Sequence, residues 1–330
     1  RLMRIIGNNP AAGNAEITAI ASGTMADGKT VVVNADGTVS AAGIQSQSTA
    51  AGTPVDPDAG TGGANTGCVF DSNSNKVVVV FRDSTNSGYG TARVGTVDSS
   101  DNSISFGSKV VFNSGNSTIF ATAFDSNSNK VVISYSDGGN SSQGTAVVGT
   151  VSGTDISFGS EVVFEAGTPN SQRMTFDSSN NKVVIAYSDG GNSSKGKAVV
   201  GTVSNTSISF GTPVQFESGQ TNNIAITFDS SSNKVVIAFA DLDNSFYGKA
   251  VVGTVSGTAI SFGSLVTFNS AKSTFISAAF DTNANKVVLT YRDVGNSSQG
   301  TAIVGTVSGT DISFGSEAVF YAGSTNYTAT

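Results

Sequence analysis

The residues best suited to chemistry in this sequence are the aspartates and asparagines of one short turn that occurs five times. Its first copy, Asp71-Ser-Asn-Ser-Asn-Lys76, spaces side-chain oxygens as the start of a calcium-binding loop does. The later positions do not fit a calcium-binding loop, because Lys76 occupies the position where such a loop needs glycine and no glutamate follows at the twelfth position. Asp and Asn also form turns by bonding their own backbone. The motif therefore predicts a structural turn without a metal ion.

The composition removes most other chemistry. The 330 residues include no histidine, a single cysteine (Cys68), 12% charged residues and a net charge of −7. Without histidine the commonest general base near neutral pH is missing, and without a basic run no nucleic-acid partner is expected. No apolar run approaches the length of about 18 residues that spans a membrane. Since no catalytic triad, Cys/His pair or phosphate loop is present either, we expect no catalytic residue, no metal and no cofactor.

The turn belongs to a repeat that indicates the fold. Its phenylalanine recurs at spacings of 54, 52, 52 and 52 residues from Phe70 to Phe280. In the second copy, β-branched runs at 119–124, 130–136, 145–151 and 156–164 predict four antiparallel strands joined by turns. Four short strands per about 50 residues predict an all-β fold, a β-propeller with five visible blades. An open, solenoid-like stack of sheets is the alternative. Glycines in the third strands are expected where adjacent blades approach closely, at Gly95, Gly149, Gly201, Gly253 and Gly305.

The chain divides into three regions. Residues 1–40 are expected to form a small β unit, with a strand at 16–21 and a hairpin around Ala35-Asp-Gly37. Residues 41–65, rich in Gly, Ala, Ser, Thr and Pro, are expected to be a linker. Residues 66–330 hold the propeller repeats, with blades starting near 66, 118, 170, 222 and 274. The segment 324–330 matches the start of a further first strand, so it either competes for a place in a five-blade ring or leads into more blades.

Variation between the copies is concentrated in two kinds of loop. The loop between the second and third strands keeps the frame Asp-x-x-Asn-Ser-x-x-Gly around variable residues, and the loops between blades vary still more. In a propeller both kinds share one face, and a fixed frame with variable filling suits a recognition surface, with drift in unselected loops as the alternative. The framing aspartates are expected to cap their own loops rather than to bind cations. The candidate recognition residues, whose aromatic members are expected to be exposed, are Tyr89, Asp137, Gln143, Lys195, Asp241, Phe246, Tyr247 and Arg292.

The repeat Phe124-Asp-Ser-Asn-Ser-Asn-Lys130, with its continuation to Val151, resembles repeats in virion proteins of marine tailed bacteriophages. The segment Gly23–Ser40 looks like a hairpin module near the start of such proteins. The resemblance implies a tail or fibre component. Residues 1–40 would attach it to other virion subunits, and the propeller would face outward. It carries over no catalytic residue.

The sequence therefore favours a non-enzymatic protein of a virion or of the extracellular space. We expect a homo-oligomer whose propeller binds a glycan or protein of a host surface. One alternative is a purely structural subunit of a virion or extracellular filament. A second is an extracellular glycan-processing enzyme, although no pair of acids stands apart from the repeat pattern.

Overall fold

The computed structural model describes residues 2–7, 15–20, 31–33, 39–41 and 66–326 of a chain that divides into two compact units, 1–52 and 53–330. In the first unit, β1 (Leu2–Gly7) pairs antiparallel with β2 (Ala15–Ile20), and β3 (Val31–Val33) pairs with β4 (Val39–Ala41). The strands predicted at 16–21 and on either side of the hairpin turn are confirmed, and β1 is additional. The turn at 35–37, the linker from 42 to 65 and residues 327–330 lie outside the described residues.

Residues 66–326 of the second unit form five four-stranded antiparallel blades, numbered 1–5 here, that begin near the expected positions. Within each blade we call the strands A to D in chain order. Blade 1 contains β5 (Thr66–Asp71), β6 (Lys76–Asp83), β7 (Tyr89–Asp98), β8 (Ser103–Phe106) and the start of β9 (Val110–Asp125). Blade 2 contains the rest of β9, β10 (Lys130–Asp137), β11 (Gln143–Ser152), β12 (Asp155–Phe158) and β13 (Val162–Glu165).

The remaining blades follow the same plan. Blade 3 contains β14 (Pro169–Asp177), β15 (Lys182–Asp189), the short turn η1 (Gly190–Asn192), β16 (Lys195–Ser204), β17 (Ser207–Phe210) and the start of β18 (Val214–Asp229). Blade 4 contains the rest of β18, β19 (Lys234–Asp241), β20 (Tyr247–Ser256), β21 (Ala259–Phe262) and the start of β22 (Val266–Asp281). Blade 5 contains the rest of β22, β23 (Lys286–Asp293), β24 (Gln299–Ser308), β25 (Asp311–Phe314) and β26 (Ala318–Ser324).

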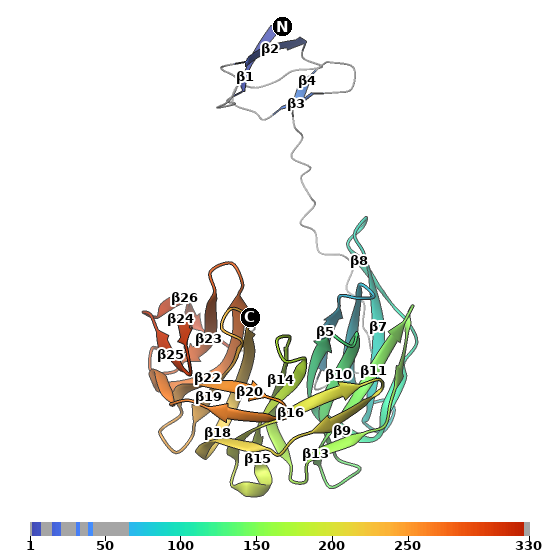
Figure 1. Cartoon of the computed structure of the whole chain (residues 1–330), viewed down its shortest axis with the longest axis vertical. Helices are drawn as coiled ribbons and strands as arrows, with labels where there is room; N and C mark the ends of the chain where they lie inside the picture. Colours follow the sequence, from blue (N-terminus) through green and yellow to red (C-terminus); the bar gives the residue numbers. More distant parts are fainter. Residues whose placement is uncertain (1, 8–14, 21–30, 34–38, 42–65, 327–330) are drawn as a thin grey trace. The chain divides into compact units, whose positions relative to one another are not determined.

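The blades succeed one another through their A strands. Strands β5, β9, β14, β18 and β22 lie next to each other in chain order, and Figure 1 shows the blades following an arc from β5 and β7 to β24 and β26. Most junctions between blades are continuous strands instead of the expected loops. In β18, for example, the first residues pair with β16 of blade 3 and the later ones with β19 of blade 4. Because its two ends pair with strands of different blades, this polar segment stays extended. The residue pattern of the segment does not reveal pairing with strands so far away in the sequence.

The hydrophobic core lies between the blades. One cluster joins Val132, Val148 and Phe164 of blade 2 to Ile185 and Tyr187 of blade 3, and three equivalent clusters fill the other interfaces. In blades 2, 3 and 4, strand B and most of strand C are buried on both faces, which explains their continuous runs of Val and Ile in place of strict alternation. Each large side chain buried in this way contributes about 1.5–3 kcal/mol. Stacking therefore stabilises sheets that could not bury both faces alone.

The glycines in the C strands approach their own blade and not the neighbouring one, which corrects the sequence-based expectation. A Cβ on Gly149 would lie 2.8 Å from Ile156 Cδ1 and 3.0 Å from Phe158 Cε1, both on β12 of the same blade. The close contact between blades occurs at the break in strand D. A Cβ on Gly159 would lie 1.8 Å from the carbonyl oxygen of Thr206 in the next blade. We call the equivalent residues junction glycines: Gly107, Gly159, Gly211, Gly263 and Gly315.

The repeated A–B turn is structural, as its sequence predicts. Asp71 Oδ1 accepts hydrogen bonds from the backbone N–H groups of Asn73 at 2.9 Å and Ser74 at 3.0 Å. Lys76 turns away from this aspartate and donates to Thr96 Oγ1 at 2.9 Å. Across residues 66–326 and the four short strands of the first unit, no group of three or more metal-ligating side chains comes together. The same residues include no helix long and apolar enough to cross a membrane.

Candidate recognition face

The B–C loops and the D–A crossovers lie on one face, as the repeat pattern predicts. In blade 3 the carbonyl oxygen of Ser194, in the B–C loop, accepts from the N–H of Thr221 at 2.8 Å. The crossover that contains Thr221 also bonds to the next blade, where the N–H of Leu242 donates to Gln220 O at 2.9 Å. This crossover is thus fixed between the B–C loops of two blades, and the crossovers into blades 2 and 5 are held in the same way. We call this surface the loop face.

The framing aspartates cap their own loops. Asp137 Oδ1 accepts from Gly139 N at 2.9 Å, and Asp241 Oδ1 accepts from Asp243 N at 3.1 Å. Both aspartates are buried, at 7% and 4% exposure. The structure thus places Asp137 and Asp241 as loop caps with little exposed surface, and Asp241 Oδ2 also lies 2.6 Å from Lys249 Nζ.

The aromatic candidates are less accessible than expected. Tyr89, Phe246 and Tyr247 are all half-buried. Phe246 adopts a left-handed backbone conformation, with φ of 64°, and its ring packs against the core between blades 4 and 5. Lys272 Nζ lies 4.5 Å from the centre of this ring, a cation–π contact across the junction. Phe246 therefore stabilises the junction, and only part of its ring reaches the solvent.

The remaining candidates are spread over several blades. Gln143 Oε1 accepts from Asn140 Nδ2 at 2.8 Å within its own loop. Arg292 donates to Ser298 Oγ at 3.0 Å and to Asn326 Oδ1 at 3.3 Å. Lys195 is half-buried at the start of β16. The structure does not bring the sequence-predicted residues together into one site.

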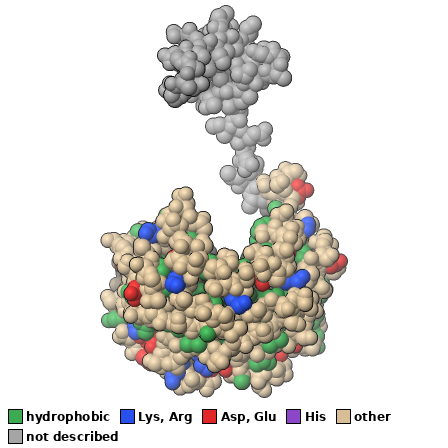
Figure 2. Space-filling model, in the orientation of Figure 1, with side chains coloured by type: hydrophobic (Ala, Val, Ile, Leu, Met, Phe, Trp, Pro, Cys, Tyr) green, Lys and Arg blue, Asp and Glu red, His purple; other side chains and the backbone are tan. Residues whose placement is uncertain are grey.

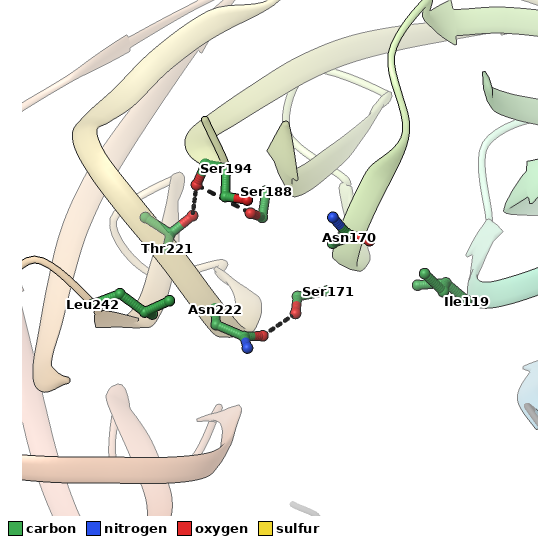
Figure 3. A pocket seen from close by; sticks show the side chains of 8 residues that line it. All are labelled: Ile119, Asn170, Ser171, Ser188, Ser194, Thr221, Asn222 and Leu242. Carbon is green, nitrogen blue, oxygen red and sulfur yellow. Dashed lines mark hydrogen bonds between the residues drawn. The ribbon is translucent and has the colours of Figure 1, made fainter. Parts of the chain in front are cut away.

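The loop face instead contains a cavity that the sequence did not indicate. It has a volume of about 460 Å³ and lies among blades 2, 3 and 4 (Figure 3). Its walls come from the starts of A strands, from B–C loops and from the crossover into blade 4. The lining residues are Ile119, Asn170, Ser171, Ser188, Ser194, Thr221, Asn222 and Leu242.

The cavity wall is polar and uncharged. Figure 3 shows Ile119 and Leu242 at opposite ends of a row of hydroxyl and amide side chains. Thr221 Oγ1 donates to the carbonyl of Ser194 at 3.2 Å, and Ser171 bonds to the side chain of Asn222 across two blades. None of the eight lining side chains is ionisable. Such a wall offers hydrogen bonds to a neutral ligand and apolar contacts at its two ends.

A strained backbone position lies at the start of the A strands. Ile119, Ser171, Asn223 and Phe275 are equivalent residues, and all have φ between 49° and 54°. Left-handed backbone is costly for branched or bulky residues such as Ile119 and Phe275. Asn223 Oδ1 accepts from the N–H of Phe275 at 2.9 Å, so this position also links neighbouring blades. The sequence shows that this position holds Ile, Ser, Asn or Phe in different copies. No residue pattern around it predicts the left-handed conformation.

The buried acids near the loop face are bound in structural ion pairs. Lys197 Nζ lies 2.6 Å from Asp189 Oδ2 and 3.4 Å from Glu165 Oε2. The Tyr187 hydroxyl donates to Glu165 Oε2 at 2.8 Å. Burial alone would raise the pKa of Glu165, but the hydrogen bonds from Gly167 N and Tyr187, together with Lys197, lower it below its usual value. Burial likewise works against Lys197, yet its two carboxylate partners raise its pKa.

Burial and the Glu165 carboxylate also raise the pKa of Tyr187 far above its usual value, so this phenol stays protonated as a donor. Glu165 therefore stays ionised and occupied by partners. This arrangement fixes neighbouring strands.

Comparisons with known proteins bear on the fold. No protein-family profile and no curated protein sequence matches the chain. Among solved structures, a triple-arginine mutant of AofleA from Arthrobotrys oligospora aligns at a TM-score of 0.52 and 9% identity, over 80% of this chain and 77% of that one. The fungal lectin of Aleuria aurantia, a six-bladed β-propeller, aligns at 0.47 and 16% identity, over 78% of each chain.

An exo-β-1,3-galactanase from Clostridium thermocellum aligns at a TM-score of 0.47 and 10% identity, over 82% of this chain and 66% of the galactanase. At these identities the likeness concerns the fold and not the activity. The blade geometry described above, together with the likeness to AofleA, confirms the all-β prediction: the second unit has a β-propeller fold.

Proposed function

We propose that the second unit is a non-enzymatic recognition module whose loop face binds a neutral, hydroxyl-rich ligand, such as a glycan of a host surface. The observation that carries this proposal is the cavity of about 460 Å³, which residues of three blades line and whose serine, threonine and asparagine side chains come from blades 3 and 4. A rigid scaffold that presents varied residues on one face is a common plan for binding proteins.

The chemistry of the cavity suits sugar hydroxyls. Serine and threonine hydroxyls both donate and accept, and the amide of Asn222 offers two donors and one acceptor. Ile119 and Leu242 supply apolar surface for the C–H faces of a sugar ring. Because the lining carries no charge, phosphate, sulfate and carboxylate groups find no counter-charge there. A neutral glycan is therefore the ligand class that this wall fits best.

The glycan proposal is tested by array binding with cavity variants. The double variant Ser171→Ala with Asn222→Ala removes a polar pair that spans two blades, and we expect affinity to fall at least about tenfold, about 1.4 kcal/mol. The matched control is Asn127→Ala with Ser178→Ala on the A–B turns, which should bind as the unaltered protein does. Equal binding by the cavity variant and the control would remove the cavity from the site.

The bacteriophage resemblance extends the proposal to biological context. We propose a tail or fibre component that contacts other virion subunits through residues 1–40 and presents the propeller to the host. Mass spectrometry of purified particles tests this: the protein should be present in stoichiometric amounts, and its absence from particles would contradict the virion assignment.

A purely structural subunit is the second candidate. It is favoured by the uncovered apolar face at the end of blade 5, where Phe320 is 56% exposed. A structure of the intact assembly distinguishes the two functions. If the loop face lies buried against another subunit, the recognition proposal is wrong, whereas an accessible loop face supports it.

A further inference from the structure

The outward face of blade 5 carries the residues that other blades bury. Val304 and Phe320 are 45% and 56% exposed, whereas the equivalent Val252 and Phe268 of blade 4 are 0% and 6% exposed. The same two positions are buried in blades 1, 2 and 3, at Val94 and Phe112, Val148 and Phe164, and Val200 and Phe216. Blade 5 therefore presents one half of an interface that the chain forms completely four times.

The backbone at the end of blade 5 repeats the hydrogen bond found at the crossovers between blades. The N–H of Thr325 donates to the carbonyl of Ser298 at 2.9 Å. The same bond joins Thr221 to Ser194, and Ser273 to Phe246, at the crossovers into blades 4 and 5. At Thr325 the backbone thus adopts the geometry that elsewhere leads into the A strand of a following blade.

The junction glycine of blade 5 lacks the neighbour that its equivalents contact. A Cβ on Gly263 would lie 1.9 Å from the carbonyl oxygen of Thr310, in the C–D turn of the next blade. Gly107, Gly159 and Gly211 meet Thr154, Thr206 and Thr258 in the same way. Gly315 has only Val304 O of its own blade, at 3.8 Å. The missing neighbour would be a C–D turn containing threonine.

Blade 1 does not match this face. It has Arg93 where blades 2–5 have Val or Ile (Val147, Val199, Val251 and Ile303), and this guanidinium bonds to Gly107 O at 2.8 Å and lies 5.4 Å from the Phe106 ring. Its C–D turn, 98–103, is longer and has no threonine.

The corresponding positions of blade 5 are Val288, Thr290, Ala302, Val304 and Phe320. None is acidic, so these positions offer no counter-charge to the Arg93 guanidinium. Blade 1 therefore differs from blades 2–5 at Arg93 and in its C–D turn, although Val77, Val79 and Phe81 keep the apolar pattern on the same side. These differences argue against closing the propeller through blade 1, whether from the same chain or from a second copy.

We propose that the outward face of blade 5 receives a further blade of this same repeat, entering by the crossover that Thr325 begins. The blade would present the apolar side shared by blades 2–5, which in blade 2 consists of Val131, Ile133, Tyr135 and Val147, all fully buried. Its C–D turn would place a threonine carbonyl against Gly315. The interface would repeat the four that the chain already contains.

The test extends the 330-residue chain at Thr330 with a copy of residues 175–221, which continues the repeat in register. We expect the extended protein to be monomeric and to have a higher thermal midpoint than the 330-residue chain, because one more interface between blades is formed. The matched control extends the chain with a copy of residues 69–117, the equivalent part of blade 1, and should not raise the thermal midpoint. Equal effects from both extensions would overturn the proposal.

Gly315→Ala gives a second readout. In the 330-residue chain, Gly315→Ala should barely shift the thermal midpoint. In the extended chain, the same substitution should lower the thermal midpoint by about as much as Gly263→Ala lowers it. An unchanged response in the extended chain would show that the added blade does not dock. If the 330-residue chain dimerises by analytical ultracentrifugation and Phe320→Ser abolishes the dimer, a second copy covers this face and the proposal is wrong.

Discussion

At the scale of single residues, the same loop-face position is stabilised differently in different blades. Tyr187 and Lys197 of blade 3 meet Glu165 from the end of blade 2. At the equivalent places, Phe239 and Lys249 belong to blade 4 and Glu217 comes from the end of blade 3. Blades 2 and 5 have no lysine there, and their tyrosines donate to a glutamate earlier in strand D, as Tyr135 does to Glu161 at 2.6 Å. The buried charges are thus satisfied blade by blade, which suits structure better than a shared catalytic function.

Lys197→Met should destabilise the protein by about 1–3 kcal/mol at pH 7, because it leaves Asp189 and Glu165 buried without their cation. The lowered pKa of Glu165 contributes stability above its usual value of 4.5, and this is lost as pH falls through the folded-state pKa. The raised pKa of Lys197 contributes stability below its usual value of 10.5, and this is lost as pH rises through the folded-state pKa.

The loss of unfolding free energy caused by Lys197→Met should therefore be largest between the usual pKa values of the glutamate and the lysine, and it should become smaller in acid. Urea unfolding at several pH values measures it, with Lys182→Met on an A–B turn as the control. A deficit that stays constant down to pH about 3 would contradict the role assigned to this ion pair.

The left-handed position at the start of strand A offers a second residue-scale prediction. Ile119→Asn should stabilise the protein by about 0.5–1 kcal/mol, because Asn tolerates positive φ better than Ile and would match the bonded Asn223 of blade 4. The reverse change, Asn223→Ile, should destabilise by about 1–2 kcal/mol, because it removes the bond to Phe275 N and introduces strain. Urea midpoints test both, and changes of the same sign would contradict the explanation.

At the scale of elements, the outer strand D is the part that joins blades. It breaks at the junction glycine, so that one half pairs with the end of strand C and the other half with its start, as β12 and β13 do on β11. The break lets the backbone of one blade contact the C–D turn of the next. The approach leaves no room for a side chain, which makes glycine a requirement of packing at this point.

Gly211→Ala should therefore cost about 2 kcal/mol or more, because its Cβ would lie 1.9 Å from the carbonyl oxygen of Thr258 and backbone must move. Gly153→Ala is a useful comparison. The φ of 63° at this position would strain an alanine, although no atom lies within 4 Å of the added Cβ. Its cost should be smaller, about 1 kcal/mol. Thermal unfolding of both variants checks the order, and a larger loss for Gly153→Ala would refute the packing explanation.

At the scale of the whole molecule, the low charge content sets the response to salt. Figure 2 shows Lys, Arg, Asp and Glu scattered singly over the visible side of the second unit, among a majority of uncharged side chains. Hydroxyl and amide groups are not screened by ions, and the cavity on the loop face is lined by such groups and two aliphatic side chains. Recognition there would depend on hydrogen bonds and shape.

Glycan binding should accordingly change by less than about twofold between about 50 mM and about 500 mM NaCl. Titration of an array-identified glycan at both concentrations measures this, with Lys195→Ala as a check on charge at the rim of the face. A steep fall in affinity with salt would point to an acidic ligand and away from the neutral one proposed.

Most of the architecture could be predicted from the sequence because it depends on local pattern repeated five times. The 52-residue period, the Asp-Asn turns and the Val-Val-Ile runs predicted the blades, the A–B turns and the placement of both loop types on one face. The predicted capping by the framing aspartates is also confirmed, since it uses backbone groups two or three residues away.

The candidate site depended on tertiary structure. Which loop residues meet, and how far each is buried, is set by the packing of neighbouring blades, so Asp137 and Asp241 are inaccessible and Phe246 supports a junction. The cavity combines residues from 119 to 242, and no local pattern relates positions so far apart. The sequence by itself thus determined the repeating blade, because hydrogen bonding and hydrophobic periodicity act locally. Only the tertiary structure decided the cavity on the loop face and the uncovered face of blade 5, because both depend on contacts between blades.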